Sequence, residues 1–291
     1  MSADRLLNLK NFSKERKYMK LAIDLGGTNL RIGQVDDGKI ISLKSVPCPA
    51  HGSESEVIDL MKSLVKDMMT PSVDGIGIGV PSVVDADKGI VYDVINIPSW
   101  KEVHLKDILE SAFGVRACVD NDVNCFVLGE KYFGAGKDFN DIVGITLGTG
   151  VGAGIIIDGK LYRGANTGAG EVGSLPYLQS DYEHYCSSSF ISSCSDKTGK
   201  ELTDLASQGD KNALEIWNKL GFHLGRLLQA LLFTYDPQAV IIGGGIAKAA
   251  PYFTKSMIES MNEFIYSRTI KNIQVRFSTL ANSNLLGASK L

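Results

Sequence analysis

The chain has 291 residues, of which 44% are hydrophobic and 22% charged, a mix typical of a globular protein with one large or two ordinary domains. The net charge of −3 at pH 7 provides no basic surface for nucleic acid or anionic lipid, and the longest uncharged stretch, residues 142–157, is too rich in glycine for a membrane helix. The first twenty residues lack the apolar segment of a secretory signal, and the five cysteines contain no C-x-x-C pair. We therefore expect a cytoplasmic protein with reduced thiols.

The first half of the chain predicts a polar arm followed by an α/β unit. Residues 1–19 are polar and basic, without periodicity. Beyond them, short apolar runs separated by turns predict strands, and apolar residues at helical spacing predict helices. In chain order we expect three strands over 21–46, a helix over 53–69, a strand over 75–81, a helix over 105–113 and a strand over 115–119.

The second half repeats this order. We expect a helix over 122–133, strands over 141–147, 151–157 and 160–162, a long helix over 211–234 that ends before Asp236 and Pro237, a strand over 239–242, a helix over about 252–267, a strand over 273–277 and a short C-terminal helix. Two similar halves predict an α/β fold with two domains and a ligand-binding cleft between them. The expected domains are residues 20–119 together with about 280–291, and residues 120–279; two unrelated α/β layers are the alternative.

Glycine clusters follow three of the predicted strands and favour a phosphate or nucleotide site. Glycine permits positive φ and lets a ligand approach the backbone closely. The residues concerned are Asp24, Gly26, Gly27, Thr28 and Asn29 in DLGGTN, Gly148, Thr149 and Gly150 in GTGVGAG, and Gly243, Gly244 and Gly245. Backbone N–H groups and the Thr28 hydroxyl can bind phosphate oxygens, whereas Asp24 needs Mg²⁺ or its waters in between. No P-loop motif occurs, and an ordinary hairpin with an aspartate cap is the alternative for DLGGTN taken alone.

Three polar segments favour a polyol site. In VDNDVNC, Asp122 follows a predicted strand and can accept the proton of an attacking hydroxyl, while Asn121 binds the neighbouring hydroxyl; helix capping is the alternative role of Asp122. Glu171 lies between glycines in GAGEVG, and Asn96 lies in the loop NIPSW. For Glu171 and Asn96 taken alone, ordinary surface polarity is the alternative.

Together, DLGGTN, NDVN, GAGEVG and DPQAVIIGGGIA resemble the ROK family (repressors, open reading frames, kinases) of the actin/hexokinase fold, which has two ribonuclease H-like domains. The resemblance runs from about Leu21 to the C-terminus. It implies an ATP-dependent sugar kinase in which DLGGTN and GITLGTGVGAG are phosphate loops and IIGGGIA is the adenosine loop. It also implies that Asp122 is the catalytic base and that Asn96, Asn121 and Glu171 bind the sugar.

The chain departs from the family pattern after Glu171. Ser174 stands where the family has a histidine that binds sugar and zinc, and the family's C-x-C-G-x-x-G-C-x-E zinc motif is missing. Because His184, Cys186 and Cys194 do not supply four zinc ligands at suitable spacing, we expect no zinc site. Glu183 is expected to replace the family's terminal sugar-binding glutamate, with a solvated loop residue as the alternative.

These observations predict a hexose kinase, similar to glucokinases, fructokinases and mannokinases, that uses ATP and Mg²⁺. Asp24 would orient the metal directly or through water. The expected partner is a small sugar, a homodimer is compatible with the resemblance, and neither nucleic acid nor membrane is expected. About twenty residues precede DLGGTN, too few for the helix-turn-helix domain of family repressors. A non-catalytic sugar-sensing regulator is the main alternative, and another actin-fold phosphotransferase or ATPase is a third; the presence of Asp24 and Asp122 favours the kinase.

Overall fold

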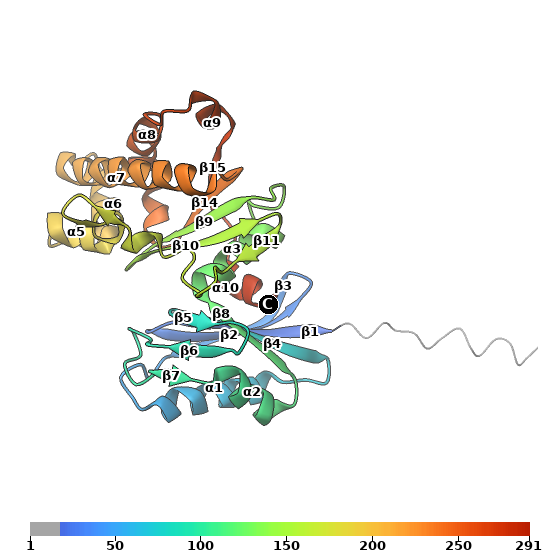
Figure 1. The fold of residues 1–291 in the computed structure, drawn as a ribbon. Helices are drawn as coiled ribbons and strands as arrows, with labels where there is room; N and C mark the ends of the chain where they lie inside the picture. The colour runs from blue at the N-terminus through green and yellow to red at the C-terminus, as the bar shows by residue number, and fades with distance from the viewer. Residues whose placement is uncertain (1–17) are drawn as a thin grey trace, which may run out of the picture.

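The structure is a computed structural model that describes residues 18–291, so the predicted arm over 1–19 lies almost wholly outside the described residues. Two lobes are stacked, each built around a five-stranded sheet (Figure 1). The strand orders are β3-β2-β1-β4-β8 and β11-β10-β9-β14-β15. In each sheet three antiparallel strands are followed by two parallel ones, which confirms the repeated order of elements and the two-lobed α/β fold.

The first lobe forms around two central strands, β1 and β4, whose residues are mostly buried. Leu21, Ile23 and Leu25 of β1 are inaccessible to solvent, as a central strand requires. The α1 helix begins with a capping box between Ser53 and Glu56 and buries its apolar face on the sheet. The elements are β1 (Met19–Leu25), β2 (Asn29–Asp36), β3 (Lys39–Pro47), α1 (Glu54–Met68), β4 (Val73–Val80), α2 (Leu105–Phe113) and β8 (Arg116–Asn121).

A small sheet that the sequence analysis did not predict covers one end of the first lobe. It consists of β5 (Val83–Asp85), β6 (Ile90–Tyr92) and β7 (Glu102–Val103), strands too short to show a period. Ile97 and Trp100 are fully buried beneath it, and Asn96 between them and β6 is exposed. The loop NIPSW is therefore anchored by its apolar residues and presents its asparagine outward.

The second lobe has the same sheet with longer helices. Gly221 and Gly225 of α7 lie so close to the α8 backbone that a Cβ at either position would overlap it. The elements are β9 (Ile142–Leu147), β10 (Val151–Ile157), β11 (Lys160–Tyr162), α7 (Lys211–Tyr235), β14 (Ala239–Gly243), α8 (Ala250–Met261) and β15 (Gln274–Phe277).

Two parts of the second lobe differ from the prediction. The helix predicted over about 252–267 is wrong in its bounds: α8 ends at Met261, because the chain then turns Phe264 into the core, and a separate α9 (Ser267–Asn272) follows. The segment between Glu171 and α7, for which no element was predicted, contains short elements. These are the 3-10 turn η2 (Val172–Ser174), β12 (Pro176–Tyr177), β13 (Ser180–Asp181), α4 (Tyr182–Cys186), α5 (Ser188–Cys194) and α6 (Gly199–Ser207).

Two helices lie between the sheets, α3 (Asp122–Phe133) and α10 (Ser283–Ala288) (Figure 1). They pack so closely that a Cβ at Gly129 would overlap the Ser283 carbonyl, and one at Gly287 would overlap the Cys125 carbonyl. This contact brings the C-terminal segment beside the start of α3. Among the helices in residues 18–291, none combines the length and apolarity needed to cross a bilayer.

Candidate active site

Asp122 is the first residue of α3 and lies where the two lobes meet. The strand β8, which leads to Asp122, runs parallel to β4, and its Asp120 lies opposite Gly79. The helix cap is Asn121, whose Oδ1 accepts the backbone N–H groups of Val123 (2.8 Å) and Asn124 (3.3 Å). The capping role considered for Asp122 thus belongs to Asn121. The Asn121 Nδ2 donates one hydrogen bond to the Ser82 carbonyl at 3.1 Å, which leaves its second hydrogen for a ligand.

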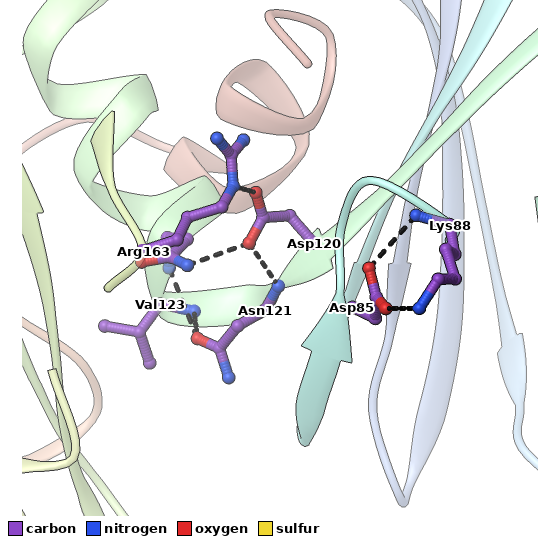
Figure 2. A network of polar contacts seen from close by, with 7 residues as sticks. Asp85, Lys88, Asp120, Asn121, Val123 and Arg163 are labelled. Carbon is purple, nitrogen blue, oxygen red and sulfur yellow. Dashed lines mark hydrogen bonds and ion pairs between the residues drawn. The ribbon is translucent and has the colours of Figure 1, made fainter. Parts of the chain in front are cut away.

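The turn before Asp122 is held by Asp120, which is 2% exposed (Figure 2). Asp120 Oδ1 accepts the N–H of Asn121 and the Nδ2 of Asn124, both at 2.8 Å. Its Oδ2 accepts the Nε of Arg163, at 2.7 Å, from the segment that follows β11 in the second lobe. Sequence analysis missed Arg163, because nothing in an arginine beside a glycine-rich loop indicates a partner on the other lobe.

The Asp122 carboxyl is surrounded by other carboxylates. Burial, together with the charges of Asp24 and Glu171, raises its pKa to about 7, although hydrogen bonds from backbone N–H groups lower it. A carboxyl group that titrates near neutral pH can both hold and release a proton under ordinary conditions. The structure thus brings Asp122, Asp24 and Glu171 together.

Asp24 lies in β1, opposite Arg31 of β2, and is 7% exposed. Its Oδ2 accepts the Arg31 Nε at 2.9 Å and also the Nη2, whereas its Oδ1 has no hydrogen-bond partner within residues 18–291. Arg31 Nη1 also donates to Asn282 Oδ1 at 3.3 Å, just before α10. The pair therefore ties the first glycine turn to the C-terminal segment.

The first glycine turn lies against the loop that carries Asn96. A Cβ at Gly27 would come within 2.7 Å of the Asn96 Cβ, so only glycine allows this approach. Thr28 and Asn29 are exposed at the tip of the turn. Among the glycines singled out in the three turns, only Gly244 (φ +90°) has the positive φ that the sequence analysis associated with these clusters. For Gly27 the requirement is close approach instead.

The Glu183 carboxylate of α4 contacts the second glycine turn. Glu183 Oε2 accepts the Val151 N–H at 3.1 Å, and a Cβ at Gly150 would overlap that oxygen. The Ser188 backbone N–H donates to the Gly148 carbonyl at 2.9 Å, and its Oγ donates to the Thr149 carbonyl at 3.3 Å. The pKa of Glu171 is raised by burial and by the nearby charge of Glu183, so these two predicted residues also lie together.

A cavity of about 360 Å³ extends from Asp122 to the third glycine turn. Thr146, Gly243 and Gly244 line it, and Gly245 borders open space, where an added Cβ would meet no atom. Sequence analysis missed the remaining polar lining, which comes from Lys248, Ser278, Ser283 and Asn284. Lys248 closely follows the third glycine turn in sequence and could have been suspected, but Ser283 and Asn284 reach the cavity only through the packing of α10 on α3.

The segment that replaces the family's zinc motif does not fit a metal. Cys186 is fully buried, Cys194 is exposed at the end of α5, and the His184 ring packs edge-on against Tyr185. Throughout the described part of the chain, no three His, Cys, Asp or Glu side chains are grouped so that they could hold a metal ion.

The chain is similar over most of its length to known sugar kinases and to a repressor. A glucokinase from Thermotoga maritima is 30% identical, and the alignment covers 94% of this chain and 97% of that protein. The crystal structure of a ROK family glucokinase from Streptomyces griseus with glucose and AMPPNP has a TM-score of 0.81 at 29% identity, covering 94% of this chain and 98% of the other. A xylose repressor from Bacillus subtilis is 30% identical over 81% of this chain and 65% of the repressor. The ROK family profile matches residues 20–291, and the chain belongs to the ROK family.

Proposed function

We propose that this protein transfers the γ-phosphoryl group of ATP to a hydroxyl group of a hexose, with Asp122 as the general base. The observation that carries the proposal is the position of Asp122, between a cavity that reaches the third glycine turn and a group of polar residues, with a pKa of about 7. A base works best when its pKa is close to the working pH.

The acceptor sugar is proposed to lie among Asn96, Asn121, Glu171 and Glu183. Carboxylates and amides bind vicinal hydroxyl groups by accepting and donating hydrogen bonds. Glu171 and Glu183 approach from the second lobe, and Asn96 and Asn121 from the first. The glucose bound to the Streptomyces griseus glucokinase supports a hexose as the ligand.

The nucleotide is proposed to occupy the cavity that ends at Gly244, with its phosphates directed toward Asp122 and the turns that contain Gly27 and Thr149. The AMPPNP in the same relative supports ATP as the donor. Asp24 would hold Mg²⁺, directly or through water, since its Oδ1 has no hydrogen-bond partner among the described residues and one carboxylate with substrate phosphates is a usual magnesium environment. Bound Mg²⁺ supplies positive charge to phosphate oxygens.

In the proposed reaction, Asp122 accepts the proton of the sugar hydroxyl as that oxygen attacks the γ-phosphorus. The new O–P bond forms while the bond from the γ-phosphorus to the β,γ-bridging oxygen breaks, and ADP leaves in line. Asp122 then releases the proton to solvent. The default acceptor is the primary hydroxyl of an aldohexose. The residues otherwise contribute by positioning the two substrates, which is the larger part of catalysis for phosphoryl transfer.

The second candidate is a sugar-sensing regulator, favoured by the 30% identity to a xylose repressor. A panel of hexoses assayed with ATP and Mg²⁺ for sugar phosphate formation separates the two. The kinase predicts turnover of at least one hexose, with no ADP release in the absence of sugar. Sugar-induced thermal stabilisation without turnover of any hexose would favour the regulator, and ADP release without sugar would favour an ATPase.

A further inference from the structure

The segment that carries Glu183 is held to the second lobe by an aromatic cluster. We define this Tyr177 cluster as Tyr177 of β12, Tyr182 and Tyr185 of α4, Phe190 of α5 and His223 of α7. The Tyr177 ring stacks on Tyr182 at 4.3 Å with 11° between the planes, and Tyr185 meets it edge-on at 5.4 Å. The His223 ring lies 4.9 Å from Tyr185 and 5.4 Å from Phe190.

Two polar contacts fix the cluster to α7. Tyr177 Oη and His223 Nδ1 are 3.1 Å apart, and Tyr182 Oη donates to the Arg226 carbonyl at 3.3 Å. Burial raises the pKa of Tyr177 to about 12 and lowers the pKa of His223. The rings therefore stay uncharged around neutral pH, which suits packing in a half-buried site.

The short helix α4 that contains Glu183 is not stable by itself and depends on contacts with the rest of the second lobe. The α4 helix has five residues, far fewer than an isolated helix needs to be stable in water. Its N-terminus is capped by Asp181, which accepts the His184 N–H at 2.7 Å, but that contact lies within the same short segment. The Glu183 carboxylate itself has one hydrogen bond, to Val151 N–H. The packing of its neighbours Tyr182 and Tyr185 on Tyr177 and His223 connects α4 to the long α7 helix, together with the Tyr182–Arg226 hydrogen bond and the buried Cys186.

We propose that the Tyr177 cluster positions Glu183 for the acceptor sugar, and that it does so without a metal ion. The residues of the cluster are positioning residues, since they are proposed to act on the sugar through Glu183. Among the described residues no three His, Cys, Asp or Glu side chains are grouped so that they could hold a metal ion, whereas the ring contacts and the Tyr177–His223 contact join this segment to α7. The proposal rests on the assignment of Glu183 to the sugar site in the proposed function.

The test compares Tyr177→Ala and Tyr177→Phe with Tyr266→Ala, which truncates an exposed tyrosine just before α9. Tyr177→Ala is expected to raise the KM for the sugar about tenfold while kcat and the KM for ATP change less than about twofold. Tyr177→Phe keeps the stacked ring and removes only the contact with His223, so a smaller rise, about threefold, is expected. Tyr266→Ala should match the wild type.

Hydrogen exchange of residues 176–194 provides a readout that does not require turnover. Tyr177→Ala should speed exchange in α4, and dialysis of the wild type against a chelator should leave its exchange and its sugar KM unchanged. An unaltered sugar KM together with unaltered exchange in Tyr177→Ala would overturn the proposal, as would stoichiometric zinc in the purified protein whose removal loosens α4. If the wild type phosphorylates no sugar while exchange in α4 still depends on Tyr177, the cluster holds α4 and the proposed function is wrong.

Discussion

Arg163 and Asp120 form an ion pair between the two lobes: the Arg163 Nε lies 2.7 Å from Asp120 Oδ2 (Figure 2). Asp120 is the penultimate residue of β8, the strand that leads to Asp122, and the Arg163 carbonyl accepts the Ala169 N–H at 3.3 Å in the loop that leads to Glu171. One arginine therefore connects the turn with the proposed base to the loop with a proposed sugar ligand.

Replacing Arg163 is expected to destabilise the protein, because the Asp120 carboxylate is buried and would lose its only cationic partner among the described residues. With Arg163 itself 40% exposed, we expect Arg163→Ala to lower the free energy of unfolding by roughly 1–2 kcal/mol. Denaturant unfolding measures this change. The Asp120→Asn/Arg163→Ala double variant removes both charges and should be destabilised by less than the sum of the two single variants. If the double variant instead loses that full sum of unfolding free energy, the ion pair does not couple the two residues.

The sequence was sufficient for the repeated fold and for the candidate residues that lie in local patterns. Asp122 could be located because a short apolar run followed by a polar junction and a helical pattern predicts a strand-to-helix turn, and β8 and α3 have that form. Helix capping was the alternative role of Asp122, but the cap is Asn121; Asp and Asn cap helices almost equally well, and the tertiary contact of Asn121 with Ser82 is not visible in the sequence.

Contacts between distant segments could not be predicted. Arg163 and Asp120 are 43 residues apart on different lobes, and neither residue shows in its own sequence neighbourhood that the other is near. The two-residue strands β12 and β13 and the five-residue helix α4 could not be predicted for a second reason, because such short elements contain no full hydrophobic period. The rings of Tyr177 and His223 pack against α4 and α5, and these partners are visible only in the folded chain.

The rate is expected to depend on pH through Asp122. The ionised form is the base, and its pKa is raised to about 7 by burial and by Asp24 and Glu171, so kcat/KM for the sugar should increase as the pH rises through about 7 and then level off. The measurement is kcat/KM for the best hexose between pH 5 and 9 in buffers of constant ionic strength. A profile that is flat across neutral pH would contradict the assigned environment of Asp122.

Asp122→Asn is expected to lower kcat by about 10²-fold or more, the usual loss when a general base is removed, while binding of the sugar is retained.

The Asp122→Asn change should also raise the melting temperature at pH 8. An aspartate whose pKa is raised from 3.8 in the unfolded chain to about 7 in the fold contributes stability below about pH 4, and this contribution is lost as the pH rises to 7. Calorimetry at both pH values checks the sign: the variant should exceed the wild type at pH 8 and match it near pH 4. Normal turnover by the variant would refute the mechanism.

Lys248 lines the cavity between Asp122 and Gly244 and is the only cation among its lining residues in the described chain. If the cavity holds ATP, Lys248→Met should raise the KM for ATP by roughly three- to tenfold, since a partly screened charge contact with a polyphosphate is worth about 1 kcal/mol, and should leave the KM for the sugar unchanged. Lys255→Met is the matched control, because Lys255 lies on the nearby α8 helix, is 88% exposed and pairs only with Glu259 among the described residues. A changed KM for the sugar with an unchanged KM for ATP would mean that the nucleotide does not bind in this cavity. Equal effects of Lys248→Met and Lys255→Met would mean that the change in overall charge, and not a contact of Lys248, causes the effect.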